Sequence, residues 1–305
     1  MRDREAPSYR APDWVDEVDS RPYRPEPHHQ HLQPAERPIP GNPFPRKAGE
    51  GMQHASWNAG IAFAGVMLGI GAGLLIVPAI VIGILAAFLG GDILSENPST
   101  RVPLVVAQLA GQAVMLAIVV GFAREDGDTL TSLGRRLGFV RPRWRDAGWL
   151  LAGYVAFFGF ALLYGSLFEQ PQQDDLIENL GGKSGTLGLI LAALVIVGMA
   201  PVAEETLFRG FFHGGLRRSL PFWSAALMSG GLFGLVHIGG VEEFTLTAVL
   251  SVVPLLAVFG LILAWLYERT GSLWPPIAMH LINNAIAFSL GVWGTGAVLA
   301  PGLLA

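Results

Sequence analysis

The chain of 305 residues contains no cysteine, and only 14% of its residues are charged. Without cysteine it can form no disulfide, thiolate nucleophile or thiolate metal site, so a metal ion would need His, carboxylate or amide ligands. An excess of positive charge is also missing. The formal net charge is -4 and no stretch forms a basic face, which argues against a nucleic-acid partner. Apolar residues, in contrast, make up 51% of the chain, and the mean hydropathy is +0.46.

These apolar residues fall into runs that exceed the roughly 18 residues needed to cross a bilayer. The fold class predicted is all-α, a polytopic transmembrane bundle of about seven helices in the lipid bilayer of the cell membrane. The expected spans are 61–89, 102–122, 147–168, 187–216, 222–240, 245–267 and 276–299.

The amino-terminal residues, 1–56, have a different composition. They are rich in proline and charged residues and show little apolar periodicity, so they cannot bury enough surface to offset the entropy lost on ordering. We expect a disordered tail over 1–56 followed by the bundle over 57–305. No short apolar core with a cleavage site follows a basic start, so the tail is not a signal peptide.

The distribution of arginine predicts the orientation. The loop after the second span is rich in arginine, whereas the loops after the first and third spans hold mostly acidic residues. The arginine-rich loop and the amino terminus are therefore expected to be cytoplasmic. Measured from that side, at 1.5 Å per residue, Glu205 lies ~18 Å, His237 ~24 Å and His280 ~13 Å deep. An active site near mid-membrane that faces the cytoplasm is the expectation.

The most unusual feature of the fourth apolar run is a pair of adjacent glutamates near its end, Glu204 and Glu205. A charge at the centre of a membrane helix costs about 3 kcal/mol on insertion scales, so a chain that keeps one is expected to use it. Glu205 and Arg209 are four residues apart and share a helix face, whereas Glu204 points about 100° away. This spacing favours Glu204 as a base and Glu205 as the arginine-paired support, although the reverse assignment stays open. His213 is expected to be a packing or interfacial residue.

Two later apolar helices carry further polar pairs, Phe233-x-x-x-His237 and His280-x-x-x-Asn284. A spacing of four places each pair on one helix face. A carboxylate, two imidazoles and an amide can then converge. Peptide hydrolysis requires an activated water, a proton donor for the leaving amine and donors for the oxyanion, which these groups can supply.

Three segments carry a family resemblance: EETLFRG from Glu204, FGLVH from Phe233 and TGSLWPPIAMHLINN from Thr270. In this order they resemble the CPBP family of CAAX prenyl protease and bacteriocin-processing (Abi) intramembrane endopeptidases, over about residues 180–290. The resemblance implies a peptide or membrane-protein substrate. It also implies that Glu204 and His237 activate the water, that His280 and Asn284 stabilise the oxyanion, and that Arg209 belongs to the glutamate motif. Substrate identity and oligomeric state stay open.

A metal ion is a separate question. Glu204, His237 and His280 form a His₂Glu set that suits catalytic zinc with an open position for water, although no HExxH motif is present. The resemblance, to a family commonly labelled metalloprotease, favours zinc. A metal-free, glutamate-activated water is the alternative.

Two other functions compete with the glutamate protease. Residues around Ser229 and His237 resemble segments of rhomboid serine proteases, but these two residues are eight apart on one helix, ~12 Å along its axis, and cannot share a hydrogen bond. Buried Glu, His and Asn side chains also suit a non-proteolytic transporter or a scaffold. Three motifs at matched depth favour hydrolysis.

Overall fold

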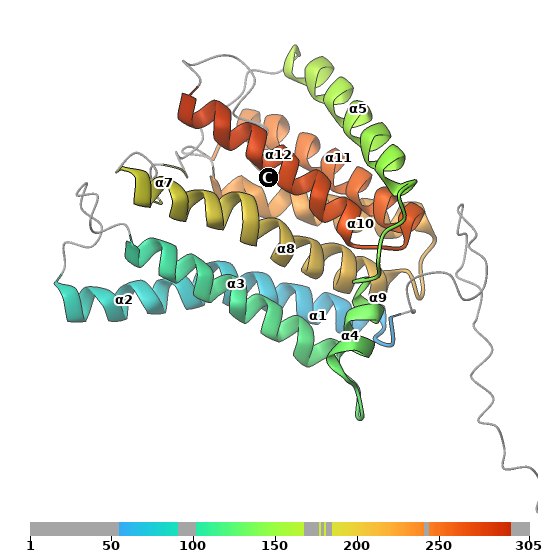
Figure 1. Ribbon diagram of the computed structural model, residues 1–305, viewed down its shortest axis with the longest axis horizontal. Helices are drawn as coiled ribbons and strands as arrows, with labels where there is room; N and C mark the ends of the chain where they lie inside the picture. Colours follow the sequence, from blue (N-terminus) through green and yellow to red (C-terminus); the bar gives the residue numbers. More distant parts are fainter. Residues whose placement is uncertain are drawn as a thin grey trace, which may run out of the picture. The chain divides into compact units, whose positions relative to one another are not determined.

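A computed structural model (Figure 1) describes residues 55–90, 102–167, 177, 180, 185–240 and 244–293. The chain divides into two compact units, Met1–Pro38 and Ile39–Ala305, and every described residue belongs to the second. The predicted tail therefore lies outside the described residues, apart from its last two positions. Immediately after it, the Trp57 indole donates a hydrogen bond to the Phe211 carbonyl at 2.8 Å.

Every regular element in the described part of the chain is helical, which confirms the all-α prediction. α1 and α2 form one run through a π-helical segment at Gly71–Ile76, and α7, α8 and α9 form another through π-helical segments at Leu194–Met199 and Thr206–His213. α10 ends in a 3₁₀ turn over His237–Gly240. The α-helices are α1 (Ala59–Ile70), α2 (Val77–Leu89), α3 (Val102–Ala123), α4 (Leu130–Leu137), α5 (Asp146–Gly165), α7 (Thr186–Ala193), α8 (Ala200–Glu205), α9 (Gly214–Leu216), α10 (Phe222–Val236), α11 (Leu246–Thr270) and α12 (Trp274–Trp293).

Six of the expected spans appear as helices long and apolar enough to cross a bilayer. They cover Ala59–Leu89, Val102–Ala123, Asp146–Gly165, Thr186–Leu216, Phe222–Gly239 and Leu246–Thr270. The seventh, α12, is a helix of 20 residues, but His280, Asn283 and Asn284 lower its hydropathy. The chain is thus a multi-pass membrane protein, and α2 fits this environment because it has no buried residue and exposes apolar side chains such as Phe88.

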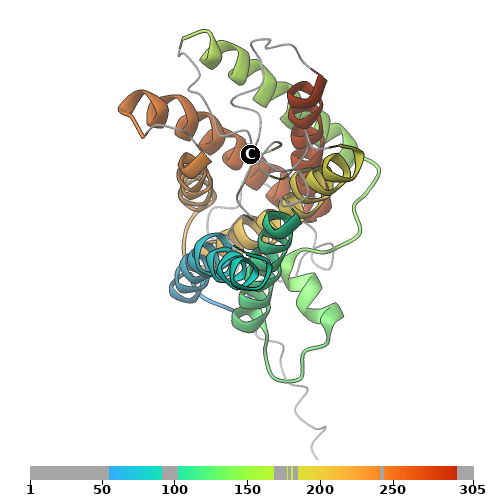
Figure 2. The ribbon, with the colours of Figure 1, turned by 90° about the vertical axis from the view of Figure 1, so that its left-hand side faces the viewer.

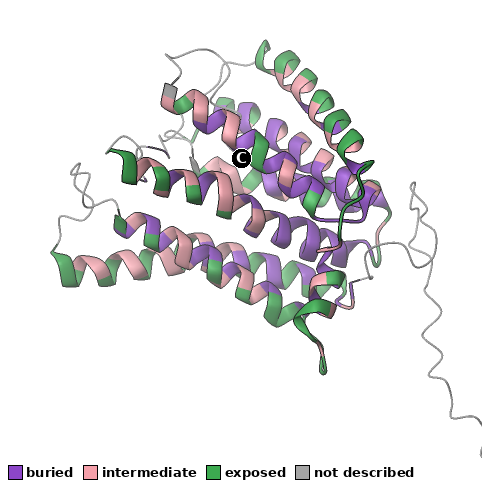
Figure 3. Ribbon diagram, in the orientation of Figure 1, coloured by how far each residue is buried: buried purple, intermediate pink, exposed green. Residues whose placement is uncertain are grey.

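Burial is greatest where α8, α10, α11 and α12 meet (Figure 3), whereas α2 and α5 carry mostly exposed or half-buried positions. The perpendicular view shows α1 and α3 nearly end on, below this group (Figure 2). The polar side chains predicted for the site belong to the buried group. The helices that carry them are therefore the best packed of the bundle.

α10 and α11 approach closely because glycines line their contact. A Cβ added to Gly234 would lie 2.4 Å from the Val253 carbonyl oxygen, and one added to Gly230 would lie 2.7 Å from that of Ala257. A Cβ added to Gly260 of α11 would lie 2.8 Å from the Cα of Gly230. Small residues let transmembrane helices pack backbone to backbone. This contact fixes α10, and with it His237, against α11.

Candidate active site

Glu205 ends α8 and is fully buried, with its charge compensated. Its Oε1 accepts a hydrogen bond from Arg209 at 2.6 Å, and His280 Nδ1 lies 3.0 Å from the same oxygen. Arg209 is also fully buried; its second terminal nitrogen donates to the Gly260 carbonyl at 3.2 Å. The ion pair expected from the spacing of four is present. It links the glutamate helix to α11 and α12.

Arg209 lies within the π-helical segment Thr206–His213 that follows Glu205 directly. Every residue of this segment is buried. π-helical turns are rare and occur frequently at functional sites, because a wider turn re-aims the side chains around it. The glutamate pair therefore lies at a change of helical pitch.

Glu204, one residue earlier, faces both histidines. Its Oε2 lies 3.9 Å from Nε2 of His237 and 3.9 Å from Nε2 of His280. These separations exceed a hydrogen bond, and Oε2 has no hydrogen-bond partner among the described residues. The side chains of Glu204 and His237 are 19% and 18% exposed, whereas that of His280 is fully buried. The cluster is therefore open on the side of Glu204 and His237.

The hydrogen bonds of the two histidines indicate how their rings are protonated. His237 Nδ1 lies 2.6 Å from the Phe233 carbonyl, which can only accept, so Nδ1 carries a proton and Nε2 of the neutral ring is an acceptor. His280 Nδ1 faces the Glu205 carboxylate, which already accepts from Arg209, so this Nδ1 also donates. Both rings thus turn Nε2 towards Glu204.

Two phenylalanines surround the charged groups. The Phe233 ring centroid lies 4.5 Å from that of His237 and 5.8 Å from that of His280. The Arg209 guanidinium lies 4.4 Å from the centroid of the same Phe233 ring. Phe259 of α11 packs edge-on against His280 at 5.5 Å. The sequence reasoning missed Phe259, because one more phenylalanine in an apolar helix carries no distinguishing signal. Both rings restrict the orientation of His280.

Asn284 is buried on α12, one turn beyond His280, and its amide nitrogen donates to the Ile196 carbonyl at 3.0 Å. This contact turns one amide proton towards the π-helical segment Leu194–Met199. The side-chain oxygen has no hydrogen-bond partner among the described residues. No recorded contact joins Asn284 to Glu204 or His237, so its expected role at the oxyanion stays a prediction.

Zinc does not fit the three side chains as they are placed. Zinc bonds of 2.0–2.1 Å in tetrahedral geometry put neighbouring ligand atoms about 3.3 Å apart, less than the 3.9 Å from Glu204 to each histidine. Within the described residues, no group of three His, Asp or Glu side chains is arranged to hold a metal ion. Zinc binding by Glu204, His237 and His280 stays a prediction, and no chemical step is assigned to it.

Ser229, the candidate of the rhomboid alternative, is fully buried on α10. Its hydroxyl donates to the Phe208 carbonyl at 3.1 Å. His237 lies one residue beyond the end of the same helix. Ser229 joins α10 to the glutamate helix, a packing role, and its hydroxyl is not directed at the His237 ring.

A second buried ion cluster, which the sequence reasoning did not identify, lies beyond Arg209. Glu268 Oε1 accepts from Arg217 Nε at 2.5 Å and lies 3.3 Å from His213 Nε2. Arg217, one residue beyond the expected span 187–216, is only 4% exposed and also donates to the Leu220 carbonyl. The sequence did contain a signal for this cluster, because Glu268 is an acidic residue within the apolar run of α11. This cluster fastens the end of the glutamate helix to α11.

Comparisons with known proteins show which families and relatives the sequence resembles. Residues 186–286 match the family described as type II CAAX prenyl endopeptidase Rce1-like. The chain is 35% identical over 141 residues to the putative membrane peptidase YdiL of Bacillus subtilis, covering 45% of this chain and 52% of that protein. It is 34% identical over 135 residues to the uncharacterized protein YyaK of Bacillus subtilis, covering 43% and 44%.

A third relative has a different named activity. The chain is 33% identical over 101 residues to V-type proton ATPase subunit c' of Eremothecium gossypii, covering 30% of this chain and 60% of that protein. Apolar membrane helices are shared by proteins of unrelated function, so this match indicates membrane helices and no particular chemistry. The chain spans about half the length of the curated relatives it matches. No solved structure matches it.

Proposed function

We propose that the chain is an intramembrane endopeptidase of the CPBP family that hydrolyses peptide bonds with a water activated by Glu204 and His237. The match of residues 186–286 to the type II CAAX prenyl endopeptidase Rce1-like family supports this proposal. One observation carries the proposal: Oε2 of Glu204 lies 3.9 Å from each of two imidazole nitrogens and has no hydrogen-bond partner in the described residues. Glu205 beside it is fully buried, and its Oε1 already accepts from Arg209 and faces His280 Nδ1, whereas the Glu204 side chain is 19% exposed. Glu204 is therefore the carboxylate that is available for chemistry.

The spacing supports a bridging water. A separation of 3.9 Å between Glu204 Oε2 and His237 Nε2 is too long for a direct hydrogen bond, but a water about 2.8 Å from each atom spans it. Glu204 takes one proton from this water as its oxygen bonds to the scissile carbonyl carbon. Glu204 then delivers that proton to the leaving amine as the C–N bond breaks. The partly exposed side of the cluster, at Glu204 and His237, is where the peptide enters.

His280 is proposed to stabilise the oxyanion. Its Nδ1 is held by the Glu205 carboxylate, which orients the ring and compensates a positive charge on it. When it is protonated on both nitrogens, His280 donates from Nε2 to the developing oxyanion. Asn284 contributes its second amide proton in this proposal. Glu205 and Arg209 position the histidine and do not touch the reacting atoms.

The substrate proposed is a peptide or a membrane protein. The matched family is named for prenylated CAAX substrates, but nothing in the described residues selects a prenyl group. The arginines at one end of the bundle support a cytoplasmic position for that end and for the amino terminus. The site is proposed to face this side, near mid-membrane.

The test is cleavage by purified protein in liposomes, with candidate transmembrane peptides read by mass spectrometry. Glu204→Gln keeps the size of the side chain and is expected to lower kcat at least 100-fold, because it removes the proton acceptor. Glu125→Gln, at an exposed glutamate outside the spans, is the matched control and is expected to retain activity. The Ser229→Ala variant is also expected to cleave the peptides, whereas a serine protease that used Ser229 as its nucleophile would lose activity.

Proton flux is recorded in the same liposomes. Equal cleavage by wild type and Glu204→Gln contradicts the proposal. So does the absence of cleavage together with a proton flux that depends on Glu204, which identifies a transport protein.

A further inference from the structure

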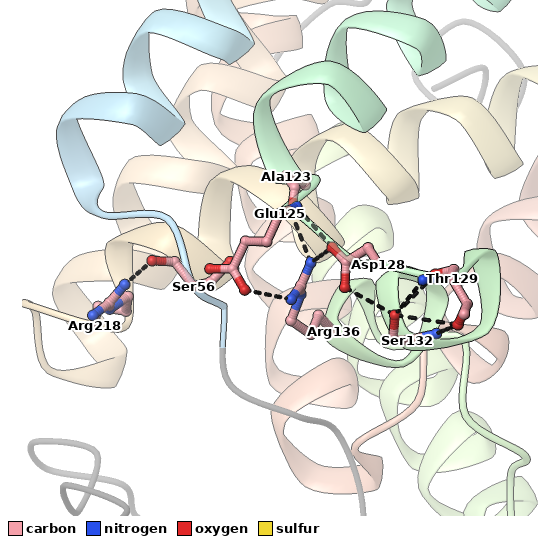
Figure 4. Close-up of polar contacts among 8 residues, drawn as sticks. All are labelled: Ser56, Ala123, Glu125, Asp128, Thr129, Ser132, Arg136 and Arg218. Carbon is pink, nitrogen blue, oxygen red and sulfur yellow. Dashed lines mark hydrogen bonds and ion pairs between the residues drawn. The ribbon is translucent and has the colours of Figure 1, made fainter. Parts of the chain in front are cut away.

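The stretch made up of α4 and its connection to α5 is strongly basic. Residues 129–145 contain five arginines and no acidic residue. Arg136 is used internally: it pairs with Glu125 at 2.8 Å and with Asp128, and donates to the Ala123 carbonyl (Figure 4). The remaining arginines are exposed. We name the run of exposed residues from Arg141 to Arg145 the basic shelf.

The basic shelf is held rigidly on the bundle. Just before it, the Tyr267 hydroxyl donates to the Leu137 carbonyl, the Leu273 amide to the Gly138 carbonyl and the Ser272 hydroxyl to the Val140 carbonyl. Gly138 has a φ of +97°, and the Tyr267 ring fills the space where a Cβ would lie. At its other end, the Arg143 amide donates to buried Asp146, the first residue of α5. The shelf is therefore fixed to the start of α5 and to the turn between α11 and α12.

The exposed side chains of the shelf combine positive charge with a large apolar ring. Trp144 is 83% exposed, and the Arg145 guanidinium lies 5.4 Å from its ring centroid. Arg143 lies 3.6 Å from Asp146, but the described part of the chain records no acidic partner for Arg141 or Arg145. An exposed tryptophan between arginines is costly in water and is typical of the bilayer interface.

Neighbouring aromatic residues place the shelf at the level of the lipid headgroups. Trp149, one turn into α5, stacks with Arg269 at 4.1 Å, and Trp274 at the start of α12 packs against Phe139 at 5.6 Å. Tryptophans near helix ends form the aromatic belt of membrane proteins. The shelf directly precedes α5, one of the helices apolar enough to cross a bilayer, so its charges are expected to lie near the headgroups, whose attraction decays over about 8–10 Å.

We propose that the basic shelf binds the headgroups of anionic phospholipids in the surrounding bilayer, through Arg141, Arg143 and Arg145, with Trp144 inserted at the interface. The arginine side chains supply planar, bidentate donors that match a phosphate group. Each basic residue near an anionic surface strengthens attraction about fivefold. The binding does not depend on the chemistry proposed for Glu204.

The test compares lipids and matched variants of the full chain. Native mass spectrometry in detergent micelles measures the Kd of phosphatidylglycerol and of phosphatidylcholine with the same acyl chains. Wild type is expected to bind phosphatidylglycerol more tightly than phosphatidylcholine. Arg141→Gln/Arg145→Gln is expected to raise the Kd of phosphatidylglycerol up to about 25-fold and to leave the Kd of phosphatidylcholine unchanged. The control, Arg124→Gln/Arg218→Gln, removes two exposed arginines outside the shelf and is expected to keep the preference.

A second measurement reports the position of Trp144 directly. Brominated phosphatidylglycerol in nanodiscs is expected to quench the tryptophan fluorescence of wild type more than that of Trp144→Leu, and more than brominated phosphatidylcholine does. Equal affinity of wild type and the shelf variant for phosphatidylglycerol overturns the proposal, as does an equal loss in the control. Tighter binding of a hexaglutamate peptide than of the lipid also overturns it, because the shelf is then a site for an acidic protein segment.

Discussion

Replacing Arg209 with methionine is expected to destabilise the protein more than almost any other single change. The substitution keeps the length of the side chain but leaves the fully buried Glu205 carboxylate without its arginine, with only the His280 contact remaining. It removes the 2.6 Å bond to Glu205, the 3.2 Å bond to Gly260 and the contact of the guanidinium with the Phe233 ring. Loss of one partner of a buried ion pair costs about 3–5 kcal/mol.

A double-mutant cycle separates the ion pair from simple loss of packing. Glu205→Gln alone leaves the arginine unpaired and is expected to cost a similar amount. Arg209→Met/Glu205→Gln removes both charges, so it is expected to be destabilised by several kcal/mol less than the sum of the two single variants. The control is Arg218→Met, at an exposed arginine just after α9; it removes only a surface hydrogen bond to the Ser56 carbonyl (Figure 4) and is expected to cost about 1 kcal/mol or less.

The assay is reversible unfolding in mixed micelles of dodecyl maltoside and SDS, followed by tryptophan fluorescence. Cleavage is measured on the same samples. Because Glu205 orients His280, the double variant is expected to regain stability without regaining activity. Additive losses in the cycle, or a loss below about 1 kcal/mol for Arg209→Met, would refute the reasoning, since the pair would then not be a coupled, buried charge.

Three further predictions follow from other parts of the molecule. Gly234→Ala is expected to lower the thermal midpoint, at a cost of about 1–3 kcal/mol, because its Cβ would lie 2.4 Å from the Val253 carbonyl; Gly231→Ala, with open space around it, is expected to leave the midpoint unchanged. If zinc is required, exhaustive chelation abolishes cleavage and elemental analysis finds one zinc per active chain; full activity without metal contradicts zinc binding. Hydrogen bonds from the Glu125 amide and Ser132, together with Arg136, lower the Asp128 pKa below its ordinary 3.8, so Asp128 stabilises the fold above pH 3.8. The gap in thermal midpoint between wild type and Asp128→Asn is therefore expected to narrow as pH falls through the lowered pKa, and a gap independent of pH argues against this linkage.

Apolar run length and helical spacing were sufficient to predict most of the architecture. The six spans begin and end within a few residues of their expected limits, because a bilayer leaves a helix as the only local way to satisfy the backbone. The same reasoning found the Glu205–Arg209 pair and the convergence of Glu204 with two histidines. These features depend on local geometry and on matched depth, both of which can be read along one chain.

The features that were missed depend on contacts between helices. The bond from Asn284 to the Ile196 carbonyl exists only because α12 lies beside a π-helical segment, and no residue pattern announces such a turn. Phe259 acquires its place against His280 from the packing of α11 on α12. Glu268 could have been found, since an acid inside an apolar run is costly, but its partners are decided by tertiary contacts.

One row of side chains explains why Glu204 is available. Glu205, Arg209, His213 and Arg217 follow one another at intervals of four, and the last three bond to α11, through Gly260 and Glu268. Glu205 compensates the charge of Arg209 near one end of the row, and Glu268 compensates that of Arg217 at the other. These contacts fix the rotation of the glutamate helix and its register against α11. A residue next to the row points about 100° away from it. Glu204 is therefore directed towards His237 and His280 because its neighbour is held by the row, and a shift of one residue would exchange the two glutamates.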